Sequence, residues 1–348
     1  GRFVSTEKRN ENFMLKQSRY SKGKKNVKQY SKNNASKKSG SGKNSYNAYY
    51  KKNDDGFQPK SNGKSNYGKK KYPSKPKGYP KKNAQKPSIK IAFLGGLNEI
   101  GKNITLVECE NDIIIIDCGM AFPDGDMLGV DLVIPDFTYI EQNADRVKGI
   151  ILTHGHEDHI GGLPFLLSKV NVPIYGTPLT LGLVGNKLKE HSLYNQSQLN
   201  VINAGQSIKL GCMKIDFIHV NHSIPDAVAF AIHTPGGTIV HTGDFKIDCT
   251  PITGDMIDLS SFARVGDEGV LALLSESTNA ERPGYTPTER TVSDSLDNLF
   301  KSAENYRIII ATFASNVNRV QQIIDCAEKY GRKVAFSGRS MAVSYTHL

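Results

Sequence analysis

The segment Thr-His-Gly-His-Glu-Asp-His at residues 153–159 constrains this chain more than any other part of the sequence. It holds three of the nine histidines and directly follows an apolar run that predicts a buried strand. In an extended turn His154 and His156 can grip one ion, whereas Asp158 and His159 point towards a second. Imidazole and carboxylate are the ligands of catalytic zinc, so the segment predicts a pair of metal sites at a strand end.

Two later segments offer the ligands that would complete such sites. His222 lies beyond an apolar strand and before a Pro-containing turn, which makes it a good ligand. Asp244 follows Gly243, whose missing side chain lets the backbone approach a metal closely. Other histidines are predicted to be structural residues or hydrogen-bond partners of the ligands: His191, His219, His233 and His241.

Apolar runs place strands on both sides of the histidine-rich segment. Three segments rich in Ile and Val, separated by Gly and Asn turns, predict strands over 88–96, 104–109 and 112–119. Helical length and periodicity follow over 159–170 and 178–191, and strands return from about residue 199. The order of strands, helices and strands predicts an α/β fold, an αββα sandwich over residues 88–276 with sites at strand ends.

From residue 277 the pattern changes to alternating helices and strands. Helices are predicted over 288–303 and 314–331, and strands over 306–312 and 332–338. This βαβ-like order predicts the start of a second domain with a parallel sheet over residues 277–342. Residues 343–348, VSYTHL, correspond to one reading frame of a common adaptor of sequencing libraries, so we predict that they are not biological.

Residues 1–87 differ sharply from the rest in composition. They carry 25 Lys and Arg against four Asp and Glu, and contain no Ile, Cys or His. Such a segment cannot bury enough apolar surface to fold, so we predict a disordered basic arm before an acidic globular part. The arm would attract RNA, or merely act as a solubilising tail. Its tyrosines are available to stack on bases, among them Tyr20, Tyr30, Tyr49, Tyr50, Tyr67 and Tyr72.

Composition also excludes several classes of protein. The five Cys have no regular spacing, which excludes a disulfide scaffold and a CxxC zinc ribbon, and they are predicted to be small buried hydrophobes. No apolar run resembles a signal peptide or a membrane span, so no membrane association is expected.

Together these segments resemble the ribonuclease J family, in the β-CASP branch of the metallo-β-lactamase superfamily. The HxHxDH pattern with a later His and a Gly-Asp pair is shared across the superfamily, and the flanking residues narrow the resemblance to this family. The resembling segments are AFLGGLNEIGKN (92–103), GVDLVIPDFTYI (129–140), LTHGHEDHIGGLPFLL (152–167), NHSIPDA (221–227), HTGDFKID (241–248), LLSESTNAERPGYT (273–286) and ATFASNVNRVQQI (311–323).

The resemblance implies a role for each candidate site residue. The implied zinc ligands are His154, His156 and His222 for the first ion, Asp158 and His159 for the second, and Asp244 as a bridge between them. Glu276 stands where the family has an acidic residue that assists proton transfer. A structural calcium is implied near Gly129 and Asp131, and RNA contacts are implied at Ser315 and Asn316.

The function implied by the resemblance is that of a zinc-dependent ribonuclease with 5′-to-3′ exonuclease and endonuclease activity. It would carry two zinc ions per subunit, act on RNA in a bacterial cytoplasm, and form a homo-oligomer or a complex with a paralogue. The alternatives are a thioester or lactone hydrolase with the same metal core and a non-catalytic RNA-binding relative. The family's HxSGH-type motif and last zinc-binding His have no counterpart here, so the chain as given is expected to have little nuclease activity.

Overall fold

The computed structural model describes residues 86–252, 254–338 and 341. The predicted basic arm lies outside the described residues except for its last two positions, and the predicted non-biological tail lies outside them entirely. Within the described part of the chain, no helix is both long and apolar enough to cross a membrane.

The first sheet contains the strands on both sides of the predicted histidine-rich segment. Its six strands follow one another in chain order, antiparallel up to the third and parallel from there on: β1 (Ile89–Gly95), β2 (Ile104–Cys109), β3 (Asp112–Ile116), β4 (Val147–Ile151), β5 (Ile174–Gly176) and β6 (Leu199–Val201). The four consecutive isoleucines of β3 are all buried, because alternate side chains enter two different cores. The run of Ile therefore indicates a strand covered on both faces.

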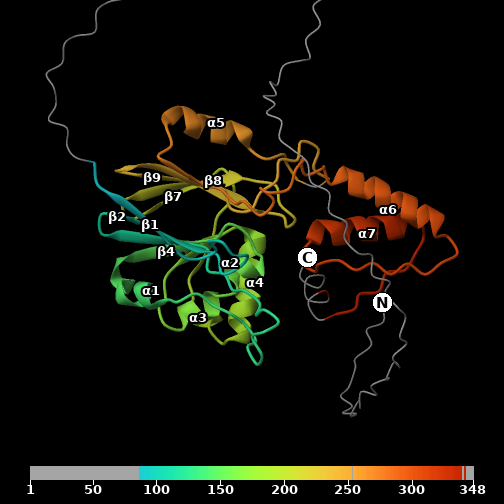
Figure 1. Cartoon of the computed structure of the whole chain (residues 1–348), viewed down its shortest axis with the longest axis horizontal. Coiled ribbons are helices and arrows are strands. Elements are labelled where there is room, and N and C mark those ends of the chain that lie inside the picture. The colour runs from blue at the N-terminus through green and yellow to red at the C-terminus, as the bar shows by residue number, and fades with distance from the viewer. Residues whose placement is uncertain (1–85, 253, 339–340, 342–348) are drawn as a thin grey trace, which may run out of the picture. The chain divides into compact units, whose positions relative to one another are not determined.

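The second sheet packs face to face on the first (Figure 1). Its strands lie in the order β11-β10-β9-β8-β7, and only β10 and β11 are parallel: β7 (Ser207–Leu210), β8 (Met213–His219), β9 (Val228–Thr234), β10 (Gly237–His241) and β11 (Ala272–Leu274). A core that includes Ile114, Phe217 and Phe230 fills the space between the sheets. The two phenylalanine rings meet edge to face, 5.3 Å apart.

Helices cover the outer faces of both sheets, as the αββα prediction requires. On the first sheet lie α1 (Thr138–Gln142), α2 (Glu157–Ile160), α3 (Leu163–Leu167) and α4 (Pro178–Glu190), with 3-10 turns at Ala144–Arg146 and Tyr194–Gln196. On the second sheet lies α5 (Leu259–Glu268), whose Phe262 and Val265 pack on Ile218 and Val240. The predicted α/β sandwich is confirmed.

The helix predicted over 159–170 is broken in the structure into α2 and α3. The carbonyl of Asp158 accepts from the backbone N–H of Asn103 at 3.0 Å, and the N–H of Gly162 donates to Cys118 at 2.8 Å, so the two groups do not bond to each other. A Cβ on Gly162 would lie 2.6 Å from the carbonyl oxygen of Gly119. The helix is therefore interrupted where Cys118 and Gly119, in the β3–α1 connection, lie against Gly162 and the carbonyl of Cys118 accepts the hydrogen bond that a continuous helix would form internally.

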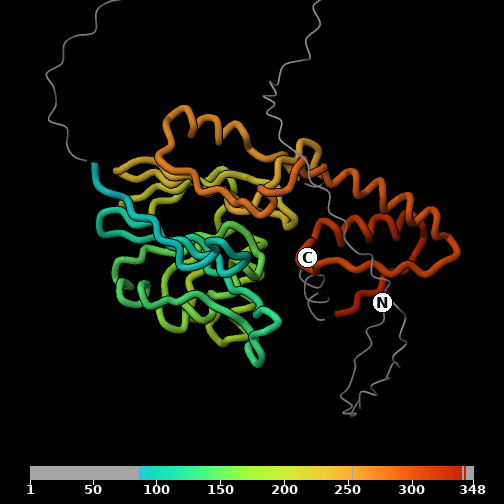
Figure 2. Tube along the Cα trace, viewed as in Figure 1, coloured from blue at the N-terminus to red at the C-terminus, as the bar shows by residue number. Residues whose placement is uncertain are grey.

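The C-terminal part of the described chain forms a helical hairpin. The predicted helices are confirmed as α6 (Arg290–Ser302) and α7 (Val317–Lys329), which lie side by side (Figure 2) around Leu296, Phe300 and Cys326. The strands predicted over 306–312 and 332–338 are wrong, because neither segment forms a strand in the structure. A strand needs a neighbouring strand with which to exchange backbone hydrogen bonds. In the segment 306–312 the side chain of Ile309 is 88% exposed, so this segment is not covered by a neighbour there.

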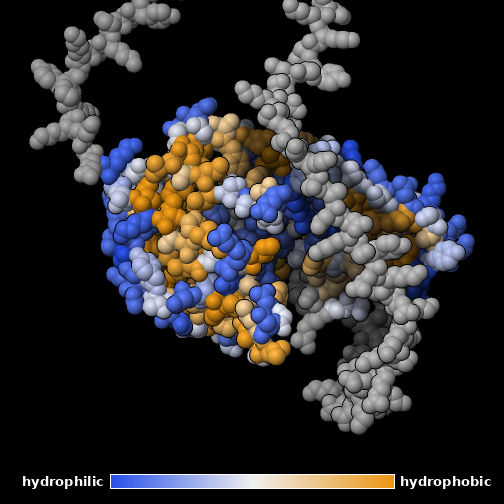
Figure 3. All heavy atoms as spheres, viewed as in Figure 1, coloured by the Kyte–Doolittle hydropathy of each residue, from blue (hydrophilic) through white to orange (hydrophobic). Residues whose placement is uncertain are grey.

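Two of the four edge strands, β1 and β11, carry exposed apolar side chains. Phe93 on β1 is 40% exposed, and Leu273 on β11 is 62% exposed. Figure 3 shows apolar surface over this part of the molecule. Both residues line a cavity of 730 Å³ that opens between the edges of the two sheets.

Replacing Glu108 by glutamine is expected to destabilise the fold by about 1–3 kcal/mol at neutral pH. Its carboxylate, on β2, lies 2.7 Å from Lys90, 3.0 Å from Arg146 and 2.8 Å from the hydroxyl of Tyr139. These contacts, that with Lys90 first, lower the pKa of Glu108 from 4.5 to about 2 despite its burial.

The contribution of Glu108 is therefore fully present above pH 4.5 and is lost as the pH falls towards 2. Urea unfolding of Glu108→Gln at several pH values tests this, with the exposed neighbour Glu110→Gln as the control. A difference in unfolding free energy that stays constant as the solution is acidified would contradict the assignment.

Candidate metal centre

The loops that follow three strands carry the predicted metal ligands to one end of the two sheets. The residues come from the β4–α2 connection (His154 and His156), from α2 itself (Asp158 and His159), from the loop after β8 (His222) and from the loop after β10 (Asp244). Within the described residues, two groups bring three metal-binding atoms within 4.8 Å of one another: His154, His156 and His222, and His154, His159 and Asp244.

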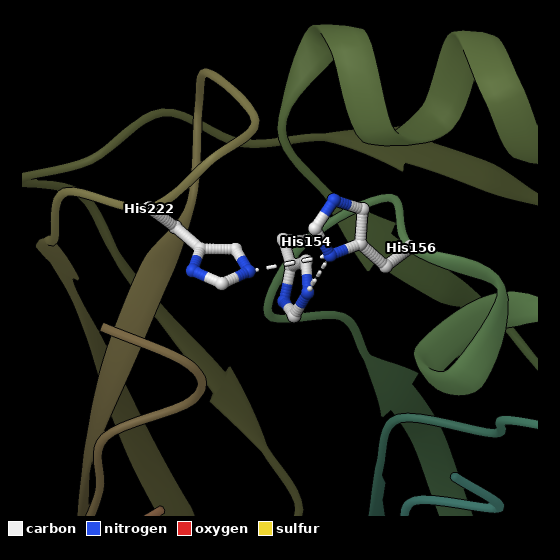
Figure 4. Close-up of side chains that lie close together, drawn as sticks. All are labelled: His154, His156 and His222. Carbon is white, nitrogen blue, oxygen red and sulfur yellow. Dashed lines mark hydrogen bonds between the residues drawn. The ribbon is translucent and has the colours of Figure 1, made fainter. Parts of the chain in front are cut away.

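Three imidazole rings converge in the first group (Figure 4). Nε2 of His154 lies 3.1 Å from Nδ1 of His156, and Nε2 of His222 lies 3.2 Å from the same atom. Around a tetrahedral zinc with bonds of 2.0–2.1 Å, ligand nitrogens would lie roughly 3.3 Å apart. The spacing of the three nitrogens therefore fits a zinc ion.

Burial keeps the imidazoles of the first group neutral. It lowers the pKa of His154 far below 6.5, and the neighbouring His159, His222 and His156 lower it further. Burial likewise lowers the pKa of His156, and it lowers that of His222 to about 4. A neutral imidazole is the form that binds metal, so these rings do not have to lose a proton at neutral pH.

The second group contains the Asp244 carboxylate, and the Asp158 carboxylate lies beside the group without belonging to it. Nε2 of His159 lies 3.5 Å from Oδ1 of Asp244 and 3.6 Å from Oδ2 of Asp158. The other oxygen of Asp244 lies 3.8 Å from Nε2 of His222, so its carboxylate faces both groups. Burial opposes the charge of Asp244, but the neighbouring histidines, His159 first, lower its pKa to about 2.

Asp117, which follows β3, orients the ligands but was missed by sequence reasoning. Its buried carboxylate accepts hydrogen bonds from the backbone N–H and from the hydroxyl of Thr153, both at 2.8 Å, and lies 2.8 Å from Nδ1 of His159. Although burial opposes it, the charges of Asp117 and Asp244 raise the pKa of His159 well above 6.5. An acid directly after four isoleucines was the signal that could have identified it.

Thr153 and Asn103 complete the support of the ligands. The hydroxyl of Thr153 lies 3.0 Å from Nδ1 of His154, which leaves Nε2 of that ring to face the cluster. The side-chain amide of Asn103 donates to the carboxylate of Asp158 at 3.3 Å and to its carbonyl at 3.1 Å. These contacts fix the rings and carboxylates before a metal arrives, as is usual around metal ligands.

Glu276 lies in the loop after β11, at the cavity of 730 Å³ that Asp158, His159 and Asp244 also line. Its Oε2 accepts from the backbone N–H of Thr278 at 2.8 Å. Glu276 thus lines the same cavity as three of the predicted ligands, and its role in proton transfer stays a prediction.

The remaining predicted residues fall into two regions. The backbone of Ser315 hydrogen bonds to the His156 ring, and Asn316 caps α7 by accepting from the N–H of Arg319 at 3.1 Å. Gly129 and Asp131 lie in an exposed loop and belong to neither metal group, so the calcium site stays a prediction.

The other histidines have separate environments. His219 lies 3.1 Å from the carbonyl of Asp255, and His233 lies 2.9 Å from the Asp216 carboxylate. The ring of His191 packs against Phe165. His241 accepts from the N–H of Gly243 and lines the cavity beside the second metal group. Their positions agree with the structural and supporting roles predicted for them.

Comparisons with known proteins identify the family. Residues 97–285 match the Metallo-beta-lactamase superfamily, and residues 305–347 match the Ribonuclease J, beta-CASP domain. The chain is 49% identical over 253 residues to Ribonuclease J 1 of Streptococcus pyogenes serotype M3, covering 73% of this chain and 45% of that protein. It is 47% identical over 261 residues to Ribonuclease J2 of Bacillus subtilis, covering 75% of this chain and 46% of that protein.

The chain therefore spans somewhat less than half the length of these relatives. A crystal structure of a protein of unknown function from Enterococcus faecalis V583 shares the fold, with a TM-score of 0.54 and 18% identity over 73% of this chain and 71% of that one. The two sheets, the helices that cover them and the sequence matches lead to one conclusion: the chain belongs to the metallo-β-lactamase superfamily, in the branch that contains the ribonucleases J.

Proposed function

We propose that this chain is part of a ribonuclease that depends on two zinc ions and cleaves RNA by hydrolysis of phosphodiester bonds. The observation that carries the proposal is the geometry of the two ligand groups, in which three imidazole nitrogens lie 3.1 and 3.2 Å apart and the Asp244 carboxylate faces both groups. The ribonuclease J relatives support RNA as the substrate.

In this proposal each ligand has a defined task. His154, His156 and His222 would hold the first ion, Asp158 and His159 would hold the second, and Asp244, whose carboxylate faces both groups, would contribute to each. Zinc at these sites supplies the positive charge that lowers the pKa of water and neutralises a scissile phosphate.

The cavity beside the second group provides the place for the reaction. A phosphodiester that entered it would meet Asp158, Asp244 and Glu276, which all line the cavity. Glu276 is suited to relay a proton to the leaving 3′ oxygen, which would give products with a 5′ phosphate and a 3′ hydroxyl. Ser315, beside His156, is suited to contact the RNA, and Asn316 follows it at the start of α7.

The proposal extends to the activity of the whole protein. We infer 5′-to-3′ exonuclease and endonuclease activity in RNA processing and decay in a bacterial cytoplasm, by a homo-oligomer or a complex with a paralogue. A thioester or lactone hydrolase would share the metal groups, but the match to a ribonuclease J β-CASP domain favours the nuclease.

Cleavage assays with the protein expressed from the complete gene test the function. We expect 5′-monophosphorylated RNA to be cleaved in the presence of zinc and to stay intact after chelation, while S-lactoylglutathione and acyl-homoserine lactones stay intact throughout. If the protein still cleaves RNA after metal analysis has shown that its metal sites are empty, the zinc mechanism is refuted. RNA binding without turnover in the zinc-loaded protein would identify the non-catalytic alternative.

Deleting residues 1–87 is expected to weaken RNA binding and to flatten its dependence on salt. The segment carries 25 basic residues, and each phosphate neutralised on a single strand contributes a slope of roughly −0.7 to the logarithm of the binding constant against that of the salt concentration. Titrations at several salt concentrations measure the slope, and zinc binding serves as the control that should not change. An unaltered slope would show that the segment is only a solubiliser.

A further inference from the structure

A buried charged cluster joins the sandwich to the α6–α7 hairpin next to the metal site. We call it the Glu289 cluster, and its members are Lys246, Asp248, Glu289, Arg319 and Gln322. Glu289 immediately precedes α6 and is the centre of the cluster.

The carboxylate of Glu289 binds cations from two different parts of the chain. Its Oε1 accepts from the ammonium of Lys246 at 2.8 Å, and its Oε2 accepts from the guanidinium of Arg319 at 2.9 Å. The side chains of all three residues are mostly buried, at 15–26% exposure. Its backbone N–H donates to Asp248, whose own carboxylate is 1% exposed.

On the sandwich side the cluster is continuous with the metal ligands. Lys246 lies two residues after Asp244, and its backbone N–H donates to the carbonyl of Asn221 at 2.8 Å. Asn221 directly precedes His222 and is itself fixed by a hydrogen bond from its side-chain amide to the carbonyl of Asp255. Lys246 therefore belongs to the loop that carries Asp244 and is hydrogen bonded to the loop that carries His222.

On the hairpin side, hydrogen bonds connect the Glu289 cluster to the ring of His156. Arg319 lies in the first turn of α7, and its backbone N–H donates to the capping side chain of Asn316. The preceding residue, Ser315, hydrogen bonds through its backbone to the His156 ring. Because Nδ1 of His156 faces the other two imidazoles, Nε2, which also lies 3.4 Å from the hydroxyl of Ser223, is the ring nitrogen that remains to donate to this backbone.

We propose that Glu289 is a positioning residue for the metal centre, which holds the start of α7 against the sandwich so that the backbone of Ser315 fixes the tautomer of His156. The proposal rests on the metal site of the proposed function. It concerns a residue that touches neither ligand group and that acts through Lys246 and Arg319.

Few groups in the cluster could take over the hydrogen bonds of the Glu289 carboxylate. In the described part of the chain, Nε of Arg319 and Oε1 of Gln322 are buried without a hydrogen-bond partner. Neutralising Glu289 would remove the carboxylate that pairs with the buried Arg319 and would leave Lys246 with only the Asp248 carboxylate, 3.7 Å away, a change that is costly in a protein interior. The contact between the hairpin and the sandwich should then loosen, while the two sheets keep their own core.

Hydrogen exchange of the metal-free chain tests the first half of the proposal. In Glu289→Gln, amides in residues 313–320 should exchange at least about fivefold faster than in the wild type, whereas amides of β2 and β3 should not change. Glu304→Gln is the matched control, because it removes the same charge at an exposed position near the end of α6. Glu289→Asp keeps the charge and should exchange more slowly than Glu289→Gln.

Unchanged exchange over 313–320 would overturn the proposal. Exchange that rises equally in β2 and β3 would also overturn it, because a general loss of stability is not positioning. If Glu289→Gln does not fold, the same comparison is made with Glu289→Asp, which must loosen residues 313–320 more than β2 and β3.

Zinc affinity tests the second half. Loss of the Ser315 contact to His156 should weaken zinc binding about tenfold in Glu289→Gln, at the low end of what such supporting contacts contribute. A local rise in exchange with unchanged zinc affinity would overturn the link to His156. If the wild-type chain binds no zinc, the proposed function fails, and the exchange experiment still decides whether Glu289 holds the hairpin in place.

Discussion

Replacing His222 by alanine is expected to weaken zinc binding at the first site by more than about 100-fold, which is beyond what loss of a supporting contact costs. The substitution removes one of three imidazole nitrogens that lie 3.1 and 3.2 Å apart, and it leaves His154 and His156 to hold the ion with Asp244. In the complete protein, RNA cleavage should fall to background. Competition with a chromophoric chelator measures the affinity directly.

His222 is a better probe than His154, because its side chain is 20% exposed whereas His154 is completely buried. Truncating His222 therefore leaves a smaller cavity, and the thermal midpoint should change little. His191→Ala, at the exposed end of α4, is the matched control. If His222→Ala binds zinc as tightly as the control does, these three rings are not the ligands of the zinc ion.

The sandwich could be predicted because its strands carry their own signal. The run Ile113–Ile116 is apolar and β-branched at every position, and this pattern is typical of a strand buried on both faces. The ligand positions followed from the same pattern, since polar residues directly after such strands must meet at the end of the sheet. The helix α5 was not predicted, because only Phe262 and Val265 and a few neighbours of its ten residues face the core.

The errors concern features that depend on partners distant in sequence. The segments 306–312 and 332–338 have strand composition but no strand beside them in the described residues, and composition alone does not supply the hydrogen bonds. The break between α2 and α3 depends on Cys118 and Asn103, which bond to groups that a continuous helix would have paired internally. Asp117 was missed for a related reason, because its role appears only when β3 and β4 lie side by side.

Replacing Asp117 by asparagine is expected to abolish binding at the second metal site while leaving the first intact. The Asp117 carboxylate accepts three hydrogen bonds, from the N–H of Thr153, from its hydroxyl and from Nδ1 of His159, each at 2.8 Å. An asparagine has one oxygen and one amide donor. If its oxygen serves the Thr153 N–H, its NH₂ group faces Nδ1 of His159.

The His159 ring would then have to accept at Nδ1 and carry its proton at Nε2. That atom lies 3.5 Å from Asp244 and 3.6 Å from Asp158, which would both accept the proton, and 3.1 Å from the amide nitrogen of Asn103, which would have to turn away from it. The lone pair of Nε2 would no longer be available to a metal. If the asparagine turns the other way, its NH₂ group faces the buried N–H of Thr153, and an unpaired buried donor costs about 1–3 kcal/mol. Both orientations work against the second site.

Two measurements check this outcome in the protein expressed from the complete gene. Metal analysis should give about one zinc fewer per chain in Asp117→Asn than in the wild type, and long-range ¹H–¹⁵N NMR should show the His159 proton on Nε2. Asp145→Asn, at an exposed position before β4, is the control that should keep both properties. A variant that retains full zinc content with the proton on Nδ1 would show that Asp117 does not set the tautomer, because the metal site would then form without its hydrogen bond.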